Sequence, residues 1–206
     1  MKPLRMAVLG VGSLGQHHAR ILASMPGVQL VGVVDPNQEQ AEAIATRHGC
    51  KPYTQAKELA GLVDAVSIVT PTKFHCTTAV EFLAQGIPCM VEKPLAGTGP
   101  QTKLMGPAPK PAGNPLEVGP IERFNPRFSP LARGCLRPKY IEAQRLAPFS
   151  GRALDVGVVF DLMIHDIDLI LSLVRSPVVS IDAIGVSIMG IHEDLANARI
   201  HFANGA

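Results

Sequence analysis

The sequence predicts an α/β fold whose N-terminal part is a doubly wound parallel sheet. Three observations predict it. From Met6 to Glu92, short runs rich in β-branched residues alternate with helical stretches, which is typical of βαβ units. A glycine-rich turn, Gly10–Gly15, lies between the first such run and a helical stretch. An acidic residue, Asp35, ends the second run about twenty residues further on.

The elements of this part follow from apolar runs and from the residues that interrupt them. Strands are expected at 6–9, at 28–34, around Tyr53, at 65–69 and at 87–91. Helices are expected at 12–25, 36–48, 55–62 and 73–85. Pro26-Gly27, Gly49 and Gly86 end three of these helices, and Pro36 occupies a first helical turn, where proline is accepted.

Beyond Pro94 this alternation fails. Ten of the 18 prolines lie from Pro94 to Pro138, and residues 97–114 follow neither the strand nor the helix period. A structureless stretch of that length is unusual inside a compact domain, so it is a lid, a linker or damage to the fold. The remaining elements are expected as strands at 116–118, 140–145, 178–187 and 198–202 and a helix at 156–174.

Composition excludes several kinds of partner. A net charge of +2 with 17% charged residues gives no basis for binding nucleic acid or an anionic membrane. No apolar run is long enough for a secretory signal or a membrane span. The four cysteines contain no CxxC pair, which argues against a disulfide or zinc framework and favours a cytoplasmic location.

The glycine-rich turn has the spacing of a Rossmann-type dinucleotide site. Its glycines allow a tight turn, close approach of a pyrophosphate and close packing of helix on strand. Asp35 stands where such domains bind the ribose, and Pro36-Asn37 follow it in place of an arginine that would accept a 2′-phosphate. The sequence therefore predicts NAD, in preference to NADP, held by Asp35 and by the loop. The loop residues are Gly10, Gly12, Ser13, Leu14 and Gly15.

Two further turns lie at the carboxyl edge of the sheet, where such folds bind ligands. Thr70-Pro71-Thr72 and His75 follow the fourth strand, and Glu92-Lys93-Pro94 follows the fifth. We expect these residues to contact the cofactor. Proline keeps Lys93 out of a helix, so its amine can point into the crevice and exchange a proton with a substrate hydroxyl. The alternative is a surface lysine at the start of a loop.

A polar stripe marks the helix expected at 156–174. Asp161, His165 and Asp168 are spaced to lie within roughly 60° of one another on an otherwise apolar helix. Burying such groups is costly unless they are paired or used. The stripe supplies either a proton-transfer group and a substrate anchor, or a hydrogen-bonded core cluster or solvent-facing edge. No further metal ligand is evident, and no metal is expected.

Five segments together resemble the Gfo/Idh/MocA oxidoreductases: GVGSLG, VVDP, TPTKFH, VEKP and DLMIHDID. The resemblance implies a Rossmann NAD-binding domain, expected at 1–118. It also implies a second, α+β substrate domain with a mostly antiparallel sheet, expected at 119–206.

The resemblance also implies roles for individual residues. Lys93 would be the catalytic acid/base, and His165 and Asp161 would meet the reacting hydroxyl. Glu92 would contact the nicotinamide ribose. The residues implied to line the substrate site, besides Asp161 and His165, are Arg123 and Asn125.

Three further segments, VGPIERFNPRF, IEAQRLAPFSG and DVGVVFDLMIHDIDLILSLV, resemble members of the family that act on a nucleotide sugar. They imply hydride transfer from the 3-hydroxyl of UDP-N-acetylglucosamine, a step towards a lipid A-type glycolipid. The alternatives are a family oxidoreductase acting on a free sugar, polyol or inositol, and a truncated NAD-binding protein without turnover.

The sequence departs from the family pattern in three places. Pro120 replaces a histidine or tyrosine, the 97–114 stretch replaces a helix, and the chain ends when only part of the second sheet has been made. We expect that domain to be incomplete, with an open edge at 198–202 through which the chain forms a homo-oligomer.

Overall fold

The computed structural model describes residues 2–105, 115–119, 121–128, 134, 137–148 and 156–206. They belong to two compact units, Met1–Gly119 and Pro120–Ala206. Pro120 and residues 106–114 of the proline-rich stretch lie outside the described residues. No helix among the described residues is long and apolar enough to cross a membrane.

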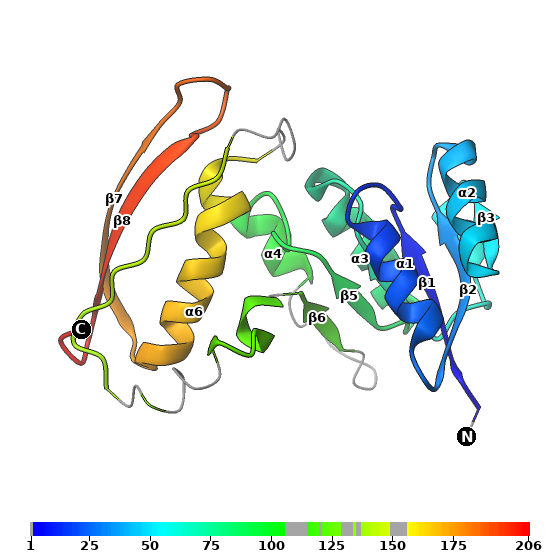
Figure 1. The fold of residues 1–206 in the computed structure, drawn as a ribbon, viewed down its shortest axis with the longest axis horizontal. Helices are drawn as coiled ribbons and strands as arrows, with labels where there is room; N and C mark the ends of the chain where they lie inside the picture. The colour runs from blue at the N-terminus through cyan, green and yellow to red at the C-terminus, as the bar shows by residue number, and fades with distance from the viewer. Residues whose placement is uncertain (1, 106–114, 120, 129–133, 135–136, 149–155) are drawn as a thin grey trace. The chain divides into compact units, whose positions relative to one another are not determined.

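A parallel sheet forms the centre of the first unit (Figure 1). Its described strands are β1 (Leu4–Leu9), β2 (Val28–Val34), β3 (Lys51–Tyr53), β4 (Ala65–Ile68), β5 (Cys89–Val91) and β6 (Leu116–Val118). They lie in the order β3-β2-β1-β4-β5-β6, and every neighbouring pair is parallel. The predicted doubly wound parallel sheet is confirmed, and its order reverses between β1 and β4, where such sheets bind ligands.

Helices cover both faces of this sheet. They are α1 (Gly15–Ser24), α2 (Gln38–His48), the 3₁₀-helix η1 (Ala56–Leu59), α3 (Thr72–Ala84) and α4 (Gly99–Met105). Side chains alternate between faces along a strand, so in β1 Val8 packs in one core while Ala7 and Leu9 pack in the other. α1 and α2 contribute to the core of Val8, and η1, α3 and α4 contribute to the core of Leu9.

One helix of this unit was not expected. Residues 97–114 were expected to follow no regular period, and α4 shows this to be wrong for Gly99–Met105. Thr98 precedes the helix, and its Oγ1 accepts a hydrogen bond from the Gln101 N–H at 3.4 Å. Pro100 lies in the first turn, where a missing N–H breaks no helical hydrogen bond. Met105 at the far end is buried in the core.

Two other helices are shorter than expected. α1 begins at Gly15, because residues 12–14 form the turn that leads into it. Of residues 55–62, only Ala56–Leu59 form a helix, η1. The Glu58 side chain caps its N-terminus by accepting a hydrogen bond from the Gln55 N–H at 2.9 Å.

The second unit contains a helix that lies beside an antiparallel hairpin (Figure 1). Its described elements are the 3₁₀-helix η2 (Ile121–Phe124), the π-helix η3 (Val159–Met163), α6 (Ile164–Val174), β7 (Val178–Val186) and β8 (Leu195–Phe202). The hairpin confirms the expected antiparallel character of this sheet. The Asp194 carboxylate closes the hairpin by accepting hydrogen bonds from the N–H groups of Ile188, Met189 and Gly190.

Two expectations for this unit are wrong in part. Residues 140–145 form no strand and pair with none of the described strands, and the Arg145 side chain instead holds Asp166 on α6. The helix expected at 156–174 is present from residue 158, but its first part is the π-helix η3, which continues directly into α6. It is also less enclosed than expected: Val174 is buried, and the other residues of α6 are half-buried or exposed.

An ion pair ties the start of β1 to the turn before β4. The Asp64 carboxylate accepts hydrogen bonds from the Arg5 backbone N–H at 2.9 Å and from the Arg5 guanidinium at 2.7 Å. The Asp64 N–H in turn donates to the Arg5 carbonyl at 2.8 Å. The hydrogen bond from the Arg5 side chain, followed by that from its backbone, lowers the pKa of Asp64 from 3.8 to about 2.

We predict that Asp64→Asn lowers the melting temperature at neutral pH. A carboxylate whose pKa is lowered by folding stabilises the folded state above its unfolded pKa and loses that contribution as pH falls through the folded pKa. The difference in melting temperature should therefore shrink between pH 3.8 and about 2. Thermal unfolding against pH measures it, with the exposed Glu81→Gln as a control of equal charge change. A difference that is independent of pH would contradict the prediction.

Candidate functional site

The glycine loop has two positions that must be glycine for packing and one that leaves space. Gly10 has a φ of +81°, and a Cβ there would lie 2.8 Å from the Val69 carbonyl oxygen. A Cβ on Gly15 would collide with the carbonyl oxygen of Gly10. A Cβ on Gly12 would meet no described atom within 4 Å. Gly12 is therefore the position at which another molecule can approach the backbone closely.

The other two predicted loop residues lie on the surface. Ser13 and Leu14 are exposed, and the Leu14 side chain is 51% accessible. The Leu14 carbonyl accepts a hydrogen bond from the His17 N–H at 2.9 Å, and the Ser13 carbonyl accepts one from the Gln16 side chain at 3.2 Å. Their backbone groups thus connect the loop to the first turn of α1.

Asp35 follows β2 and is half-buried beside the glycine loop. One carboxylate oxygen accepts the Val11 N–H at 3.0 Å, and the other accepts the Asn37 N–H at 3.0 Å. Asp35, the residue predicted to bind the ribose, therefore also fixes the glycine loop to the start of α2. Each carboxylate oxygen can accept more than one hydrogen bond, so both can still receive ribose hydroxyls.

The turn after β4 presents an unpaired buried hydroxyl. Thr70 Oγ1 is buried and has no hydrogen-bond partner among the described residues. Buried polar atoms in folded proteins are nearly always paired, so an unpaired one points to a bound molecule. Pro71 precedes α3, and Thr72 is its buried first residue.

His75 lies under this turn and is only 1% exposed. Its Nε2 lies 2.7 Å from the Thr70 carbonyl oxygen, and its Nδ1 lies 2.9 Å from the Pro94 carbonyl oxygen. Both ring nitrogens are therefore directed at backbone groups. His75 connects the turn after β4 to the turn after β5.

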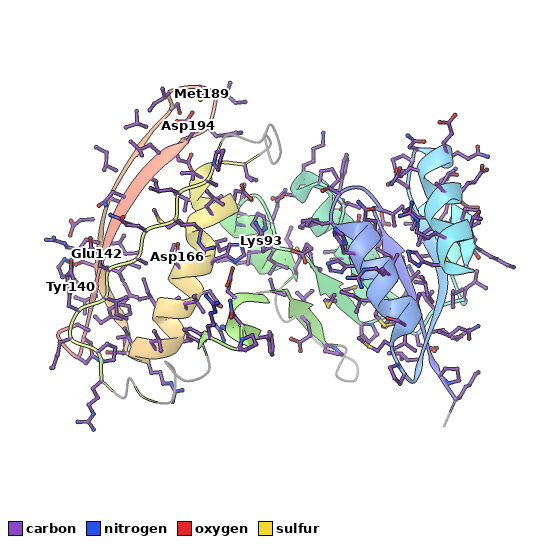
Figure 2. All side chains as sticks on the ribbon, viewed as in Figure 1. Lys93, Tyr140, Glu142, Asp166, Met189 and Asp194 are labelled. Carbon is purple, nitrogen blue, oxygen red and sulfur yellow. The ribbon has the colours of Figure 1, made fainter. Side chains whose placement is uncertain are left out.

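The turn after β5 holds the half-buried carboxylate of Glu92 next to Lys93, which is labelled in Figure 2. Glu92 Oε2 accepts the Lys93 backbone N–H at 3.1 Å, and Glu92 Oε1 lies 3.1 Å from His18 Nε2. Burial by itself raises the pKa of Glu92, but the hydrogen bonds from His18 and the Lys93 backbone, with the charges of both residues, outweigh it and lower that pKa. Lys93 is half-buried, and its bond to Pro94 is cis.

The sequence did not single out His18 or its second partner, Ser67. His18 Nδ1 lies 2.9 Å from Ser67 Oγ, which is fully buried in β4. A signal was present, because a hydroxyl inside the apolar strand Ala65–Ile68 needs a partner. The sequence could not identify that partner, which lies 49 residues away.

The predicted residues of the second unit lie on and around α6. Asp161 belongs to η3 and His165 to α6, and both are half-buried. Asp168 accepts two hydrogen bonds from the Arg123 guanidinium, at 2.6 and 2.5 Å. That pairing raises the pKa of Arg123. Asn125 is exposed, and its side chain accepts the Arg127 N–H at 3.0 Å.

A second arginine binds the same helix from the segment 137–148. Arg145 donates to Asp166 at 2.8 Å and lies 3.5 Å from Glu122, and its pKa is raised chiefly by the hydrogen bond to Asp166. The sequence did not single out this ion pair; Asp166 is labelled in Figure 2. Among the described residues, no group of three or more histidine, cysteine or acidic side chains could hold a metal ion.

We predict that alanine at Gly15 lowers stability, whereas alanine at Gly12 weakens dinucleotide binding. Gly15→Ala forces a methyl onto the Gly10 backbone and should destabilise the fold by about 1–3 kcal/mol, as overpacking does. Gly12→Ala should leave the melting temperature unchanged and weaken dinucleotide binding, because its methyl fills open space in the loop. Thermal unfolding and a binding titration measure both. Equal effects on stability would contradict the two assignments.

Known proteins share this fold and much of this sequence. The Gfo/Idh/MocA family model, described as an oxidoreductase family with an NAD-binding Rossmann fold, matches residues 4–119. UDP-N-acetylglucosamine 3-dehydrogenase of Acidithiobacillus ferrooxidans is 40% identical over 204 residues, which is 98% of this chain and 64% of that protein. The solved structure of UDP-N-acetylglucosamine 3-dehydrogenase GnnA from the same organism has a TM-score of 0.88 at 39% identity, over 100% of this chain and 68% of that one.

Other relatives carry other names. Scyllo-inositol 2-dehydrogenase (NAD(+)) of Bacillus subtilis is 32% identical over 88% of this chain and 57% of its own length. The structure of GenD2 from gentamicin A biosynthesis, in complex with NAD, has a TM-score of 0.85 at 26% identity, over 100% of this chain and 64% of that one. The chain spans less than two thirds of the length of the curated Acidithiobacillus ferrooxidans and Bacillus subtilis relatives. It belongs to the Gfo/Idh/MocA family of oxidoreductases, and residues 4–119 are its NAD-binding Rossmann domain.

Proposed function

We propose that this chain serves an NAD-dependent dehydrogenase that oxidises a secondary hydroxyl of a sugar, specifically the 3-hydroxyl of UDP-N-acetylglucosamine. The observation that carries the proposal is the 40% identity to a UDP-N-acetylglucosamine 3-dehydrogenase over 98% of this chain. The half-buried lysine beside Glu92, at the carboxyl edge of the sheet, supports it.

The residues at the carboxyl edge fit the cofactor. Gly12 leaves space for a phosphate, and the N-terminus of α1 beside it favours negative charge. Asp35 has lone pairs for the ribose hydroxyls, and the unpaired Thr70 hydroxyl can receive or donate a hydrogen bond. Glu92 contacts the nicotinamide ribose in this proposal. The nicotinamide, when bound, supplies the hydride chemistry.

Proton transfer is the task left to the side chains. Lys93 takes the hydroxyl proton at its Nζ during oxidation and returns it in the reverse direction. Asp161 and His165 orient the reacting hydroxyl, and Arg123 and Asn125 line the sugar site. We also propose a homo-oligomer formed through the β7–β8 sheet, where apolar side chains such as Val179 and Ile184 are more than 60% exposed.

NADH formation tests the proposal directly. We expect NADH absorbance to rise with NAD and UDP-N-acetylglucosamine, and Lys93→Ala to lower kcat by on the order of 10² to 10⁴, the usual worth of general acid–base catalysis. The dissociation constant for NAD should change little. Lys103→Ala, at an exposed lysine of α4, is the matched control.

The same assay separates the other candidates. Turnover of scyllo-inositol without turnover of the nucleotide sugar would favour the second candidate, which the inositol dehydrogenase relative supports. NAD binding with no NADH from any of these substrates would overturn the enzymatic proposal.

Asp35 should set the preference between the two dinucleotides. Because the Asp35 carboxylate would repel a 2′-phosphate, Asp35→Asn should lower the ratio of the NADP dissociation constant to the NAD dissociation constant. The expected change is on the order of tenfold, since a like charge at 4 Å costs at least about 1 kcal/mol. Asparagine keeps one oxygen for the loop, and Glu39→Gln on α2 is the control. Equal affinities in the unchanged protein would contradict the role.

A further inference from the structure

Two histidines from different helices hold the residues on either side of Lys93. We propose that His18 and His75 are positioning residues that fix the Lys93 backbone, so that its amine is held for proton transfer. The inference rests on the proposed role of Lys93 and extends it to two side chains that do not themselves meet the substrate.

His18 acts on the residue before Lys93. Its Nδ1 lies 2.9 Å from Ser67 Oγ in β4, and its Nε2 lies 3.1 Å from Glu92 Oε1. The other oxygen of Glu92 accepts the Lys93 N–H. The carboxylate can only accept, so Nε2 carries the hydrogen, whereas the serine hydroxyl can pair with Nδ1 in either protonation state. A continuous series of polar contacts thus runs from β4 through α1 to the backbone of Lys93.

His75 acts on the residue after Lys93. Its Nδ1 is directed at the Pro94 carbonyl and its Nε2 at the Thr70 carbonyl, at 2.9 and 2.7 Å. A carbonyl oxygen only accepts, so each contact is a hydrogen bond when that ring nitrogen carries a hydrogen, and both are hydrogen bonds together in the doubly protonated ring. The ring is also 1% exposed, so we propose that it acts through the backbone in place of the direct cofactor contact expected from the sequence.

The space around the carboxylate supports a positioning role. A Cβ on Gly119 would lie 3.2 Å from Glu92 Oε1, so the chain just after β6 passes close to the oxygen that His18 contacts. Lysine has a long flexible side chain, and an acid or base must come within hydrogen-bond reach of its proton. Fixing the backbone on both sides of Lys93 removes motion that the side chain alone cannot remove.

Asparagine and glutamine variants separate the two contacts of each ring. The asparagine amide nitrogen can take the place of Nδ1, and the glutamine amide nitrogen can take the place of Nε2. His18→Gln therefore keeps the Glu92 contact, and His18→Asn keeps the Ser67 contact. His75→Asn keeps the Pro94 contact, and His75→Gln keeps the Thr70 contact.

A crossed pattern of kcat values is the expected result. His18→Gln and His75→Asn should retain most of kcat at saturating NAD. His18→Asn and His75→Gln should lower it by on the order of 10²-fold, the effect of misplacing a catalytic group by about 1 Å. Melting temperatures are measured for all four variants. His17→Asn, at the exposed neighbouring histidine of α1, is the control. If kcat follows the melting temperature instead of this pattern, the positioning inference is overturned.

A second readout does not depend on turnover. The acylation rate of Lys93, relative to that of Lys103 in the same molecule, is measured by mass spectrometry after brief treatment with acetic anhydride. The ratio of the Lys93 rate to the Lys103 rate should change in His18→Asn and His75→Gln. In His18→Gln and His75→Asn it should stay near that of the unchanged protein. If this pattern holds without NADH formation, positioning stands and the proposed function fails. Turnover with all four variants alike would overturn positioning and leave the proposed function standing.

Discussion

The close approach of α1 to the sheet at the glycine loop is the constraint on which the site depends. Gly15 packs against the carbonyl of Gly10, and Gly10 packs against the backbone at Val69, so no side chain can separate the helix from the strand ends. His18 lies one turn further along α1 and reaches Ser67 and Glu92 because of that approach. The packing that makes room for a dinucleotide therefore also brings the histidine to the lysine-bearing turn.

Hydrogen-bond accounting distinguishes the polar groups that support the site from those left for a ligand. Ser67 and Thr70 lie close together on the chain, and both carry buried hydroxyls. His18 satisfies Ser67, whereas Thr70 Oγ1 has no partner among the described residues. Leaving a buried hydroxyl unpaired costs about 1–3 kcal/mol, and a bound molecule that pairs with Thr70 Oγ1 would recover it. His75 uses only the carbonyl of Thr70 and leaves its hydroxyl for that contact.

Local patterns predicted the parallel sheet, the glycine loop and the place of Asp35, because strand period, helix ends and close packing depend on neighbouring residues. Contacts between distant segments were not predictable in this way. The partner of Ser67 comes from another element, and residues 140–145 have an extended pattern but pair with none of the described strands. α4 was missed because the prolines of the surrounding stretch suggested irregular structure, although a proline in the first turn is compatible with a helix.

Asp168, one of the three residues of the predicted polar stripe, forms an ion pair within the second unit. Residues three apart share a face of a helix, so Asp168 lies on the same side of α6 as His165. Because Asp168 binds Arg123 through two hydrogen bonds, it holds η2 against that face. Asp166 lies two positions before Asp168 and points to another side, where it binds Arg145. Asp168 is thus best understood as the residue that anchors Arg123 on the face of α6 that carries His165.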